Sequence, residues 1–182
     1  MKCPVCLTTD LMLARLDAGL GAMHCEGCAG NWVSSSSYWY WLEQRGVNLP
    51  AEESDAPVQV ANRQQAKLCP ECNRTMIRYK VGHNLNFDLD QCHHCNGVWF
   101  DKNEWESLQA RNLHDDIHLI FTASWQSEVA KEERRQTFER IYQNKFGDAD
   151  FAELKRLREW LDKHPKRNEM LAFLMVENPY GH

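Results

Sequence analysis

CHHCNGVWFDKNEWESL, residues 92–108, sets two cysteines two residues apart and follows them with a glycine, a tryptophan and the start of a helix. A second copy, HCEGCAGNWVSSSSYWYWL at residues 24–42, again has CxxC followed four residues later by a tryptophan. Each copy is preceded at a similar distance by a CPxC pair, which starts at Cys3 in one case and at Cys69 in the other. The chain therefore contains an internal repeat.

The repeat supplies two sets of four cysteines at the spacing of tetrahedral zinc sites. Eighteen residues separate Cys6 from Cys25, and nineteen separate Cys72 from Cys92, which fits the pattern C-x2-C-x15–20-C-x2-C. The gap of two residues inside each pair lets both sulfurs face one ion about 2.3 Å away. We therefore predict two Zn²⁺ ions, one held by Cys3, Cys6, Cys25 and Cys28 and the other by Cys69, Cys72, Cys92 and Cys95.

These ligand sets predict structural metal sites rather than catalytic ones. Four sulfurs close the coordination shell, whereas a catalytic zinc usually keeps one position open for water or substrate. All eight cysteines are used, four per site. Ser124 and Ser127 in the C-terminal half have no base at a fixed spacing. We expect no enzymatic activity, and we expect each ribbon to be disordered without metal.

Two other functions of cysteine pairs are iron binding and thiol redox chemistry. Iron held by four thiolates, as in an electron carrier, is an alternative because sulfur ligands alone do not separate iron from zinc. Leu7 and Asn73 stand where rubredoxin-like knuckles carry glycine, which weakens that resemblance. A thioredoxin-type redox centre needs a reactive cysteine at a helix start. Here CPxC precedes a hairpin pattern, so this alternative is disfavoured.

The residues between the cysteine pairs predict a hairpin in each copy. Residues 75–91 alternate apolar and polar side chains on either side of Gly82-His83-Asn84, which indicates two half-buried strands joined by a turn. The first copy has a looser version of this pattern around Gly19-Leu20-Gly21. Each copy is thus expected to form a zinc knuckle, a hairpin and a second knuckle.

A helix is expected after each second knuckle. Asp101 and Glu104 have the spacing of a capping box, and Ser34 to Ser37 take that place in the first copy. The aromatic run YWYWL, residues 38–42, follows these serines. Its neighbourhood is not basic, so we expect it to pack on the ribbon rather than to stack on nucleic-acid bases.

CPxC, a hairpin, CxxCxGxW and an aspartate with a glutamate three residues later resemble the bacterial transcription factor IIB-type zinc-finger family, here in two tandem copies. The resemblance implies a zinc ribbon on each cysteine set and an association with transcription or nucleic acid. Ala29 and Asn96 stand where the family has the first of two glycines. If that position is left-handed, asparagine tolerates it better than alanine, so the first site is expected to be the looser one.

Outside the two copies, the sequence predicts a connector and a helical domain. Residues 50–66 are polar and contain proline and an acidic cluster, which is typical of a flexible or extended linker. The ribbons are then independent units unless the YWYWL run docks them together. The expected domains are ribbon 1 with its helix at 1–49, the linker at 50–66, ribbon 2 with its helix at 67–110 and an all-α domain at 111–182. The predicted fold class is a small, metal-bound α+β protein with this helical addition.

Apolar residues recur at helical spacing through the C-terminal domain. One stripe runs from Ile117 to Val129, and Phe138, Ile141, Tyr142 and Phe146 resume it up to Gly147, as one long helix or as two helices broken near residues 131–136. A second helix is expected after an Asp150 cap, and a third after Pro165. We expect these stripes to bury one another.

Charge and composition bound the location and the partner. The 182 residues carry a net charge of −5, and the chain shows no export signal and no run long enough to span a membrane, so we expect a cytoplasmic protein. A protein is the expected partner. Nucleic acid is the alternative, supported by the family resemblance and by Lys67, Arg74, Arg78 and Lys80 around one ribbon. The oligomeric state is left open.

The histidines are expected to be secondary to the cysteines. His24, His93 and His94 lie beside or between predicted ligands, but eight cysteines already complete both sites. His114 and His118 are one helical turn apart and could share a metal. The simpler interpretation of His114, His118 and His164 is that they are exposed residues near helix ends.

Overall fold

The computed structural model describes residues 1–16, 19–45, 59–61, 64–177 and 179. It divides the chain into two compact units, Met1–Ala130 and Lys131–His182, which we describe separately. Most of the predicted linker, residues 50–66, lies outside the described residues. None of the helices in the described part has the length and apolar content that a membrane span requires.

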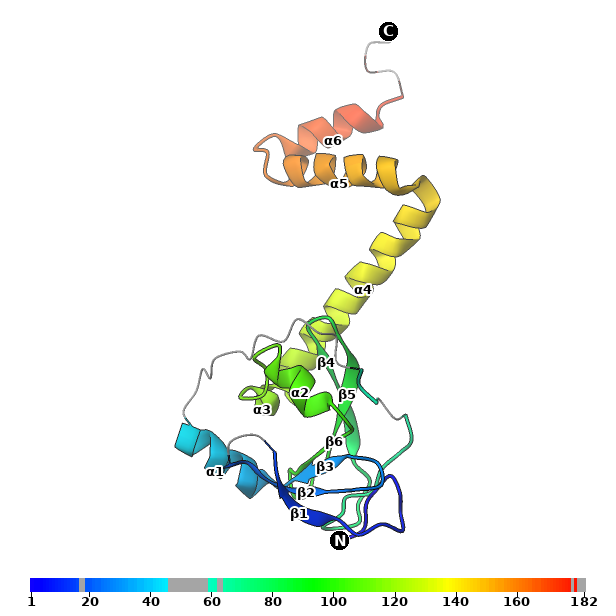
Figure 1. Cartoon of the computed structure of the whole chain (residues 1–182). Coiled ribbons are helices and arrows are strands. Elements are labelled where there is room, and N and C mark those ends of the chain that lie inside the picture. The colour runs from blue at the N-terminus through cyan, green and yellow to red at the C-terminus, as the bar shows by residue number, and fades with distance from the viewer. Residues whose placement is uncertain (17–18, 46–58, 62–63, 178, 180–182) are drawn as a thin grey trace. The chain divides into compact units, whose positions relative to one another are not determined.

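Both copies have the expected hairpin and following helix, and each adds a short third strand between them that was not expected (Figure 1). Short helices and a longer one follow. The elements are β1 Met12–Arg15, β2 Gly21–His24, β3 Asn31–Val33, α1 Ser35–Arg45, β4 Ile77–Gly82, β5 Leu85–Gln91, β6 Val98–Phe100, α2 Glu104–Gln109, α3 Ile117–Ile120, α4 Ala123–Phe146, α5 Asp148–Asp162 and α6 Arg167–Met175. This confirms the predicted α+β class with a helical C-terminal region.

The strands of the two copies form one six-stranded sheet in the order β1-β2-β3-β6-β5-β4. The last strand of each copy lies in the middle, so the two ribbons meet where β3 pairs with β6. We call this pairing the seam. The ribbons are thus halves of one sheet rather than independent units, and the join is made by strands, not by the YWYWL helix alone.

The seam has the register of a local two-fold axis. Trp32 pairs with Trp99, which is its own counterpart in the repeat, and the flanking pairs are Asn31 with Phe100 and Val33 with Val98. Each ribbon therefore presents the same strand to the other, as the two subunits of a symmetric dimer would. The two copies of the repeat thus pair like the subunits of a dimer, but within a single chain.

Gly30 and Gly97 explain why each copy has glycine two residues before its tryptophan. A Cβ built on Gly30 would lie 2.2 Å from the ring atom Cζ2 of Trp99, and one on Gly97 would lie 2.3 Å from Cζ2 of Trp32. Each glycine thus makes room for the indole of the other ribbon. The motif GxW is therefore a contact between copies, not a feature of one ribbon.

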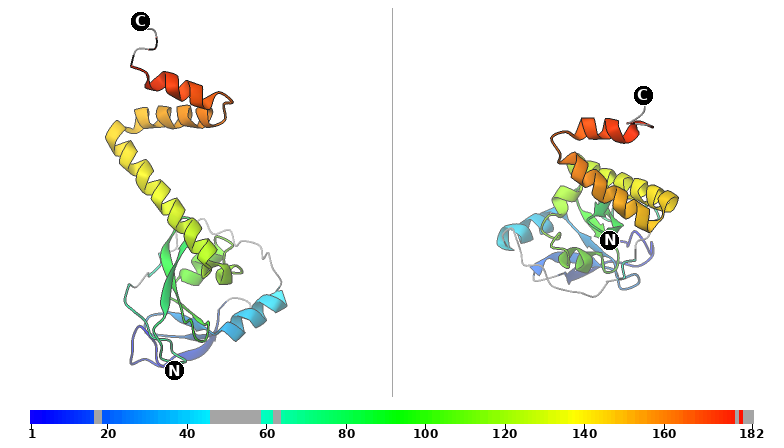
Figure 2. Two further views of the ribbon diagram at one scale, coloured as in Figure 1. Left: turned by 180° about the vertical axis from the view of Figure 1, so that it is seen from behind. Right: turned by 90° about the horizontal axis from the view of Figure 1, so that it is seen from above.

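The two faces of the sheet have different roles, because neighbouring residues of a strand point to opposite faces. Trp32 and Trp99 pack with the buried cysteines in one apolar cluster. Val33, Val98 and Phe100 belong to a second cluster, which contains residues of α1, α2 and α3. These helices lie beside the sheet in the views of Figure 2. The metal-binding side and the helix-covered side are thereby separated.

The hairpin predicted for residues 75–91 is confirmed. β4 and β5 pair antiparallel, and His83 and Asn84 connect them with φ values of 52° and 62°. Two left-handed residues are the requirement of a type I′ turn, which suits the twist of a tight hairpin. Val81, Phe87 and Leu89 from this hairpin are buried in the helix-side core.

The helix after each knuckle is confirmed, but the caps differ. In the first copy the N–H of Ser37 donates to Oγ of Ser34 at 3.1 Å, as expected for an N-cap. In the second copy Glu104 accepts from the N–H of Asp101 at 2.8 Å, which is half of a capping box. The Asp101 carboxylate does not complete the box, because it accepts the indole N–H of Trp99 at 2.9 Å.

The segment after α2 packs with the ribbons. Leu113, Ile117 and Ile120 are buried in the helix-side core, and the compact helical unit begins at Lys131. His114 is also buried, between the rings of Trp41 and Trp105. Our expectation that His114 is an exposed residue is therefore wrong, because this histidine fills space in an aromatic core.

The first stripe forms two helices, α3 and α4, but the break lies between Ile120 and Ala123 rather than near residues 131–136. α4 ends at Phe146, directly before Gly147 with φ 81°, and α5 begins at Asp148, two residues before the expected cap Asp150. The mutual burial of the three apolar stripes is not observed. Among the described residues from Lys131 onward, Leu161 alone is buried.

Candidate metal centres

The first centre is formed by the N-terminal knuckle and the loop between β2 and β3. The sulfur of Cys3 lies 3.6 Å from that of Cys28, and the sulfur of Cys25 lies 3.8 Å from that of Cys6. Burial raises the pKa of the Cys3 thiol, although the N–H groups of Cys6 and Val5, 3.3 and 3.4 Å from its sulfur, oppose this rise.

The second centre repeats this arrangement with the CPxC knuckle before β4 and the loop between β5 and β6. The sulfur of Cys95 lies 3.3 Å from those of Cys69 and Cys92, and 3.7 Å from that of Cys72. In both centres the four sulfurs lie within 4.8 Å of one another, and these two sets are the metal-holding groups found among the described residues. The structure thus brings together the eight predicted ligands in the predicted sets.

The donor sets fit a tetrahedral Zn²⁺ ion. Sulfurs about 2.3 Å from a tetrahedrally bound zinc lie about 3.8 Å from each other, close to the separations found here. All eight cysteines are free thiols, so no disulfide competes for them. Four thiolates favour zinc or iron over magnesium or calcium, which prefer oxygen ligands.

The electrostatics of the thiols also require a cation. Burial raises the pKa of Cys69 to about 11, and burial together with the neighbouring thiols raises the pKa of Cys95 further. Burial would raise the pKa of Cys92 as well, but the backbone N–H groups of Cys95 and His94 outweigh it and lower that pKa to about 7. The Cys92 thiolate can therefore form near neutral pH, and a bound divalent ion would favour ionisation of Cys69 and Cys95 beside it.

Each knuckle turns at a left-handed residue after its second cysteine. The residues are Leu7, Ala29, Asn73 and Asn96, with φ between 55° and 64°. Each donates its N–H to the carbonyl of the first cysteine of its pair, at 2.7–2.9 Å. The left-handed conformation considered for this position is confirmed at both Ala29 and Asn96, and a looser first site stays a prediction.

We expect Ala29→Gly to stabilise the zinc-loaded protein by about 0.5–1 kcal/mol, because glycine removes the strain of a Cβ in the left-handed region. The thermal midpoint should rise by about 2–3 °C in a scan at constant zinc. Asn96→Gly is the matched control and should have a smaller effect, since asparagine already tolerates this conformation. A larger gain for Asn96→Gly would contradict this account of the first site.

The histidines near the cysteines have other partners. Nδ1 of His24 lies 2.9 Å from Oδ1 of Asn31, His93 stacks on Tyr79 and hydrogen-bonds its hydroxyl, and Nδ1 of His94 lies 2.9 Å from Arg74. None of them belongs to either metal-holding set among the described residues.

A buried ionic network supports the second ribbon, and the sequence analysis did not find it. The Lys67 ammonium lies 2.5 Å from Asp90 and 3.2 Å from Asp101, with the lysine side chain only 1% exposed. Asp101 also accepts from Trp99, and Glu104 binds the Asp101 backbone. Burial raises the pKa of the Asp90 carboxyl, although the hydrogen bond from Lys67 opposes this. The network ties the start of ribbon 2 to β5, β6 and α2.

The first ribbon has no equivalent of this network. The repeat aligns Lys67 and the three acids with Met1, Met23, Ser34 and Ser37. This difference between copies is the signal that could have identified the network, because four charged residues are gained together. The two ribbons therefore share the same strands and cysteine ligands but differ in the charged side chains around them.

The basic cluster around the second ribbon is largely neutralised. Lys67 is buried in the network, and Nε of Arg78 lies 4.0 Å from Asp88 and 3.6 Å from Asp90. Phosphate binding requires cations that can approach the nucleic-acid backbone. Two of the four basic residues that supported nucleic-acid binding are therefore engaged with carboxylates.

A small cavity opens beside the seam, and we call it the seam pocket. It has a volume of about 220 Å³ and draws residues from both ribbons and from α3. The hydroxyl of Tyr38 donates to the carbonyl of Asp115 at 2.7 Å and lies 3.3 Å from Nδ1 of His118, which holds α1 against α3. The lining residues are Val33, Ser34, Ser35, Tyr38, Trp39, Gln91, Asn96, Val98, Ile117, His118 and Phe121.

The YWYWL run divides between core and surface. Tyr38, Trp41 and Leu42 are buried in the helix-side core, as expected for a helix that covers the ribbons. Trp39 and Tyr40 are exposed. Trp39 lies at the seam pocket with its ring 5.0 Å from that of His118, whereas Tyr40 does not line the pocket.

Comparison with known proteins supports the assignment of the second ribbon as a zinc finger. Residues 68–111 match the model of a family described as transcription factor zinc-finger. The match covers the second knuckle pair, its hairpin and α2, and it leaves the first ribbon outside. No curated protein and no solved structure matches the chain significantly. The chain thus contains one ribbon similar to this zinc-finger family and a second four-cysteine group built on the same plan.

Proposed function

We propose that this protein is a non-enzymatic adaptor in which two zinc ions stabilise one double ribbon, and the double ribbon binds a protein partner through the seam pocket. The closed four-thiolate sets support a structural role, because they offer no open coordination position for substrate. Bound zinc would make the loops around the pocket rigid before a partner arrives. Rigid surfaces lose less entropy on binding.

The seam pocket is the observation on which this proposal rests. Its volume of about 220 Å³ is below the roughly 300–1,000 Å³ of small-molecule sites, so it suits one inserted side chain. Val33, Val98 and Ile117 provide apolar surface, and the half-exposed Trp39 stands beside them. Aromatic residues at pockets of this kind are typical anchors of protein interfaces. We infer that the occupant is an apolar side chain of a protein partner.

The proposal is tested with Trp39→Ala in the full-length, zinc-loaded protein. Partners are captured from the native cell by crosslinking and identified by mass spectrometry, and the zinc content of the same sample is measured. We expect loss of at least about tenfold in the captured partner, as for an anchor worth more than 1.4 kcal/mol. Zinc content should stay unchanged.

Tyr40→Ala is the matched control, because Tyr40 is an exposed aromatic residue of the same helix that does not line the pocket. It should leave capture unchanged. Equal loss in both variants, or no loss in Trp39→Ala, would refute the role of the pocket.

Nucleic-acid binding is the second candidate, and the description of the matched family favours it. The net charge of −5 and the engaged cations of the second ribbon weigh against it. Titration of labelled single- and double-stranded oligonucleotides at low and moderate salt decides, because phosphate contacts weaken steeply as salt rises. Metal analysis of the purified protein and its visible absorbance separate zinc from an iron electron carrier.

A further inference from the structure

The helical unit, Lys131–His182, exposes more apolar surface than a small unit with a single buried side chain can sustain. Leu161 is its one buried residue in the described part, and eleven large apolar side chains are exposed. These are Phe138, Ile141, Tyr142, Phe146, Leu154, Leu157, Trp160, Phe173, Leu174, Met175 and Val176. A domain of this size normally needs a packed core, a metal, disulfides or a partner to remain folded.

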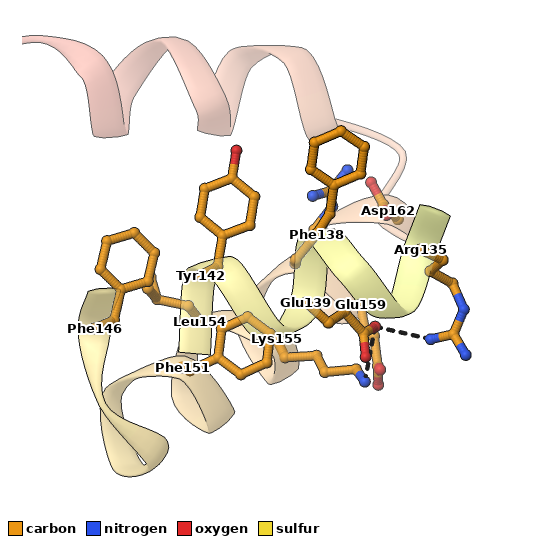
Figure 3. A pocket seen from close by; sticks show the side chains of 11 residues that line it. Arg135, Phe138, Glu139, Tyr142, Phe146, Phe151, Leu154, Lys155, Glu159 and Asp162 are labelled. Atoms are coloured by element: carbon orange, nitrogen blue, oxygen red, sulfur yellow. Dashed lines mark hydrogen bonds and ion pairs between the residues drawn. The ribbon is translucent and has the colours of Figure 1, made fainter. Parts of the chain in front are cut away.

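Part of this surface forms a groove between α4 and α5. Phe138, Tyr142 and Phe146 line it from α4, and Phe151 and Leu154 line it from α5 (Figure 3). Its volume is about 630 Å³, nearly three times that of the seam pocket. A groove of this size has room for several side chains of a helix laid along it.

One ion pair connects the two helices along the groove, and a second lies beside it within α4. Glu139 of α4 accepts from Arg135 at 2.8 Å and lies 3.1 Å from the ammonium of Lys155 on α5 (Figure 3). Exposed pairs contribute little stability, so they cannot replace an apolar core. They do keep polar groups at the rim and leave the rings of the groove uncovered.

The exposed area matches what a stable dimer requires. Aromatic side chains bury roughly 150–250 Å² when covered, and the five exposed rings of this unit are each about half exposed. They present about 500 Å², and the six aliphatic and methionine side chains bring the total to roughly 800–1,000 Å². A standard interface takes about 800 Å² from each partner, so the exposed apolar side chains of the unit together can supply that area.

The charges at the rim favour a second copy over a charged partner. Three cations, Arg135, Lys155 and Arg158, stand with three anions, Glu139, Glu159 and Asp162. A balanced rim gives no preference to a strongly acidic or basic protein. Across a two-fold axis, however, cations of one copy can face anions of the other, because such an interface uses the same patch twice. Two helical hairpins that pair in this way form a four-helix arrangement with a shared core.

We propose that the helical unit is a homodimerisation surface, in which the groove between α4 and α5 is filled by the same apolar helices of a second copy of this chain. This inference rests on the helical unit alone and does not depend on the role of the seam pocket. It predicts a dimer with twice the 21.3 kDa mass of the chain, carrying two double ribbons.

The test is the mass of the full-length, zinc-loaded protein by sedimentation over a wide concentration range. The wild type should be dimeric at micromolar concentration. Phe138→Glu should weaken the dimer by about 100-fold or more, because the two-fold axis buries two unpaired carboxylates. Zinc content and the exchange protection of the sheet should stay unchanged, which excludes unfolding of the double ribbon, and an unchanged helical content in circular dichroism excludes unfolding of the helical unit.

Asn144→Glu is the matched control, since Asn144 is exposed on α4 and lies outside the groove. It should leave the dimer intact. A wild type that stays monomeric at the highest concentration, even if it captures a different protein, would overturn the proposal. So would a dimer that Phe138→Glu and Asn144→Glu affect equally.

Discussion

Replacing Cys95 with serine should disorder both ribbons rather than the second ribbon alone. The substitution removes one of four thiolates from the second centre, and zinc binding contributes roughly 10–16 kcal/mol in zinc-finger peptides. That is comparable to the roughly 5–15 kcal/mol that holds a typical domain folded. The ribbons also share one sheet, so the loss should spread across the seam.

Specific contacts transmit this loss. Trp99 follows the second centre and occupies the space above Gly30 of the first ribbon. In the other direction, the indole N–H of Trp32 donates to Glu71, inside the second CPxC knuckle, at 3.1 Å. If the second knuckle unfolds, Trp32 therefore loses both its hydrogen bond and its packing against Gly97.

The measurement is the number of zinc ions per chain by native mass spectrometry, together with amide exchange of β1, β2 and β3. Cys95→Ser should bind fewer than one zinc per chain, and the amides of β2 and β3 should exchange far faster. Cys3→Ser should have the reciprocal effect on β5 and β6. Ser36→Ala, at an exposed position of α1, is the control. A Cys95→Ser protein that retains one zinc and a protected first ribbon would show that the ribbons fold independently.

The local plan of each ribbon could be predicted because its signals are short-range. Two cysteines separated by two residues form one knuckle, and alternation around Gly82-His83-Asn84 predicts the hairpin without knowledge of the rest of the chain. The ligand sets follow from the same spacing. The identity of the ion does not follow in this way, since zinc and iron share four-thiolate sites.

The joint sheet could not be predicted because its strands are too short to show a period. β3 and β6 have three residues each, and strand assignment from alternation needs four or more. That Trp32 and Trp99 each pack against the glycine of the other ribbon does not follow from their positions in the sequence. The GxW spacing is repeated in both copies, but the sequence alone does not show that each glycine contacts the tryptophan of the other ribbon.

The helical unit and Lys67 show two further limits. Periodicity indicates that one side of a helix is apolar, but it does not indicate which surface covers it, so the stripes of α4 and α5 were assigned to each other. Lysine is rarely fully buried, and Lys67 was therefore counted with the surface cations. Only the positions of Asp90 and Asp101 in the fold explain its burial.

Lys67→Ala should destabilise the protein by about 3–5 kcal/mol, which is the usual result of removing one partner of a buried ion pair. The change leaves the carboxylates of Asp90 and Asp101 buried without their common cation. It also frees the segment before Cys69 from β5 and β6. We expect a lower denaturant midpoint at fixed excess zinc and weaker zinc binding by the second centre.

Two variants separate the buried charge from other effects. Lys2→Ala breaks the pair with Asp10, which has a similar length of 2.8 Å but side chains 59% and 62% exposed, so the denaturant midpoint should change far less than in Lys67→Ala. The triple variant Lys67→Met, Asp90→Asn, Asp101→Asn removes all three charges of the buried Lys67–Asp90 and Lys67–Asp101 ion pairs. It should recover much of the stability lost in Lys67→Ala, because uncharged side chains of similar size are less costly to bury. If Lys67→Ala costs no more than Lys2→Ala, the buried network does not stabilise the second ribbon, and the zinc site together with the seam must hold it unaided.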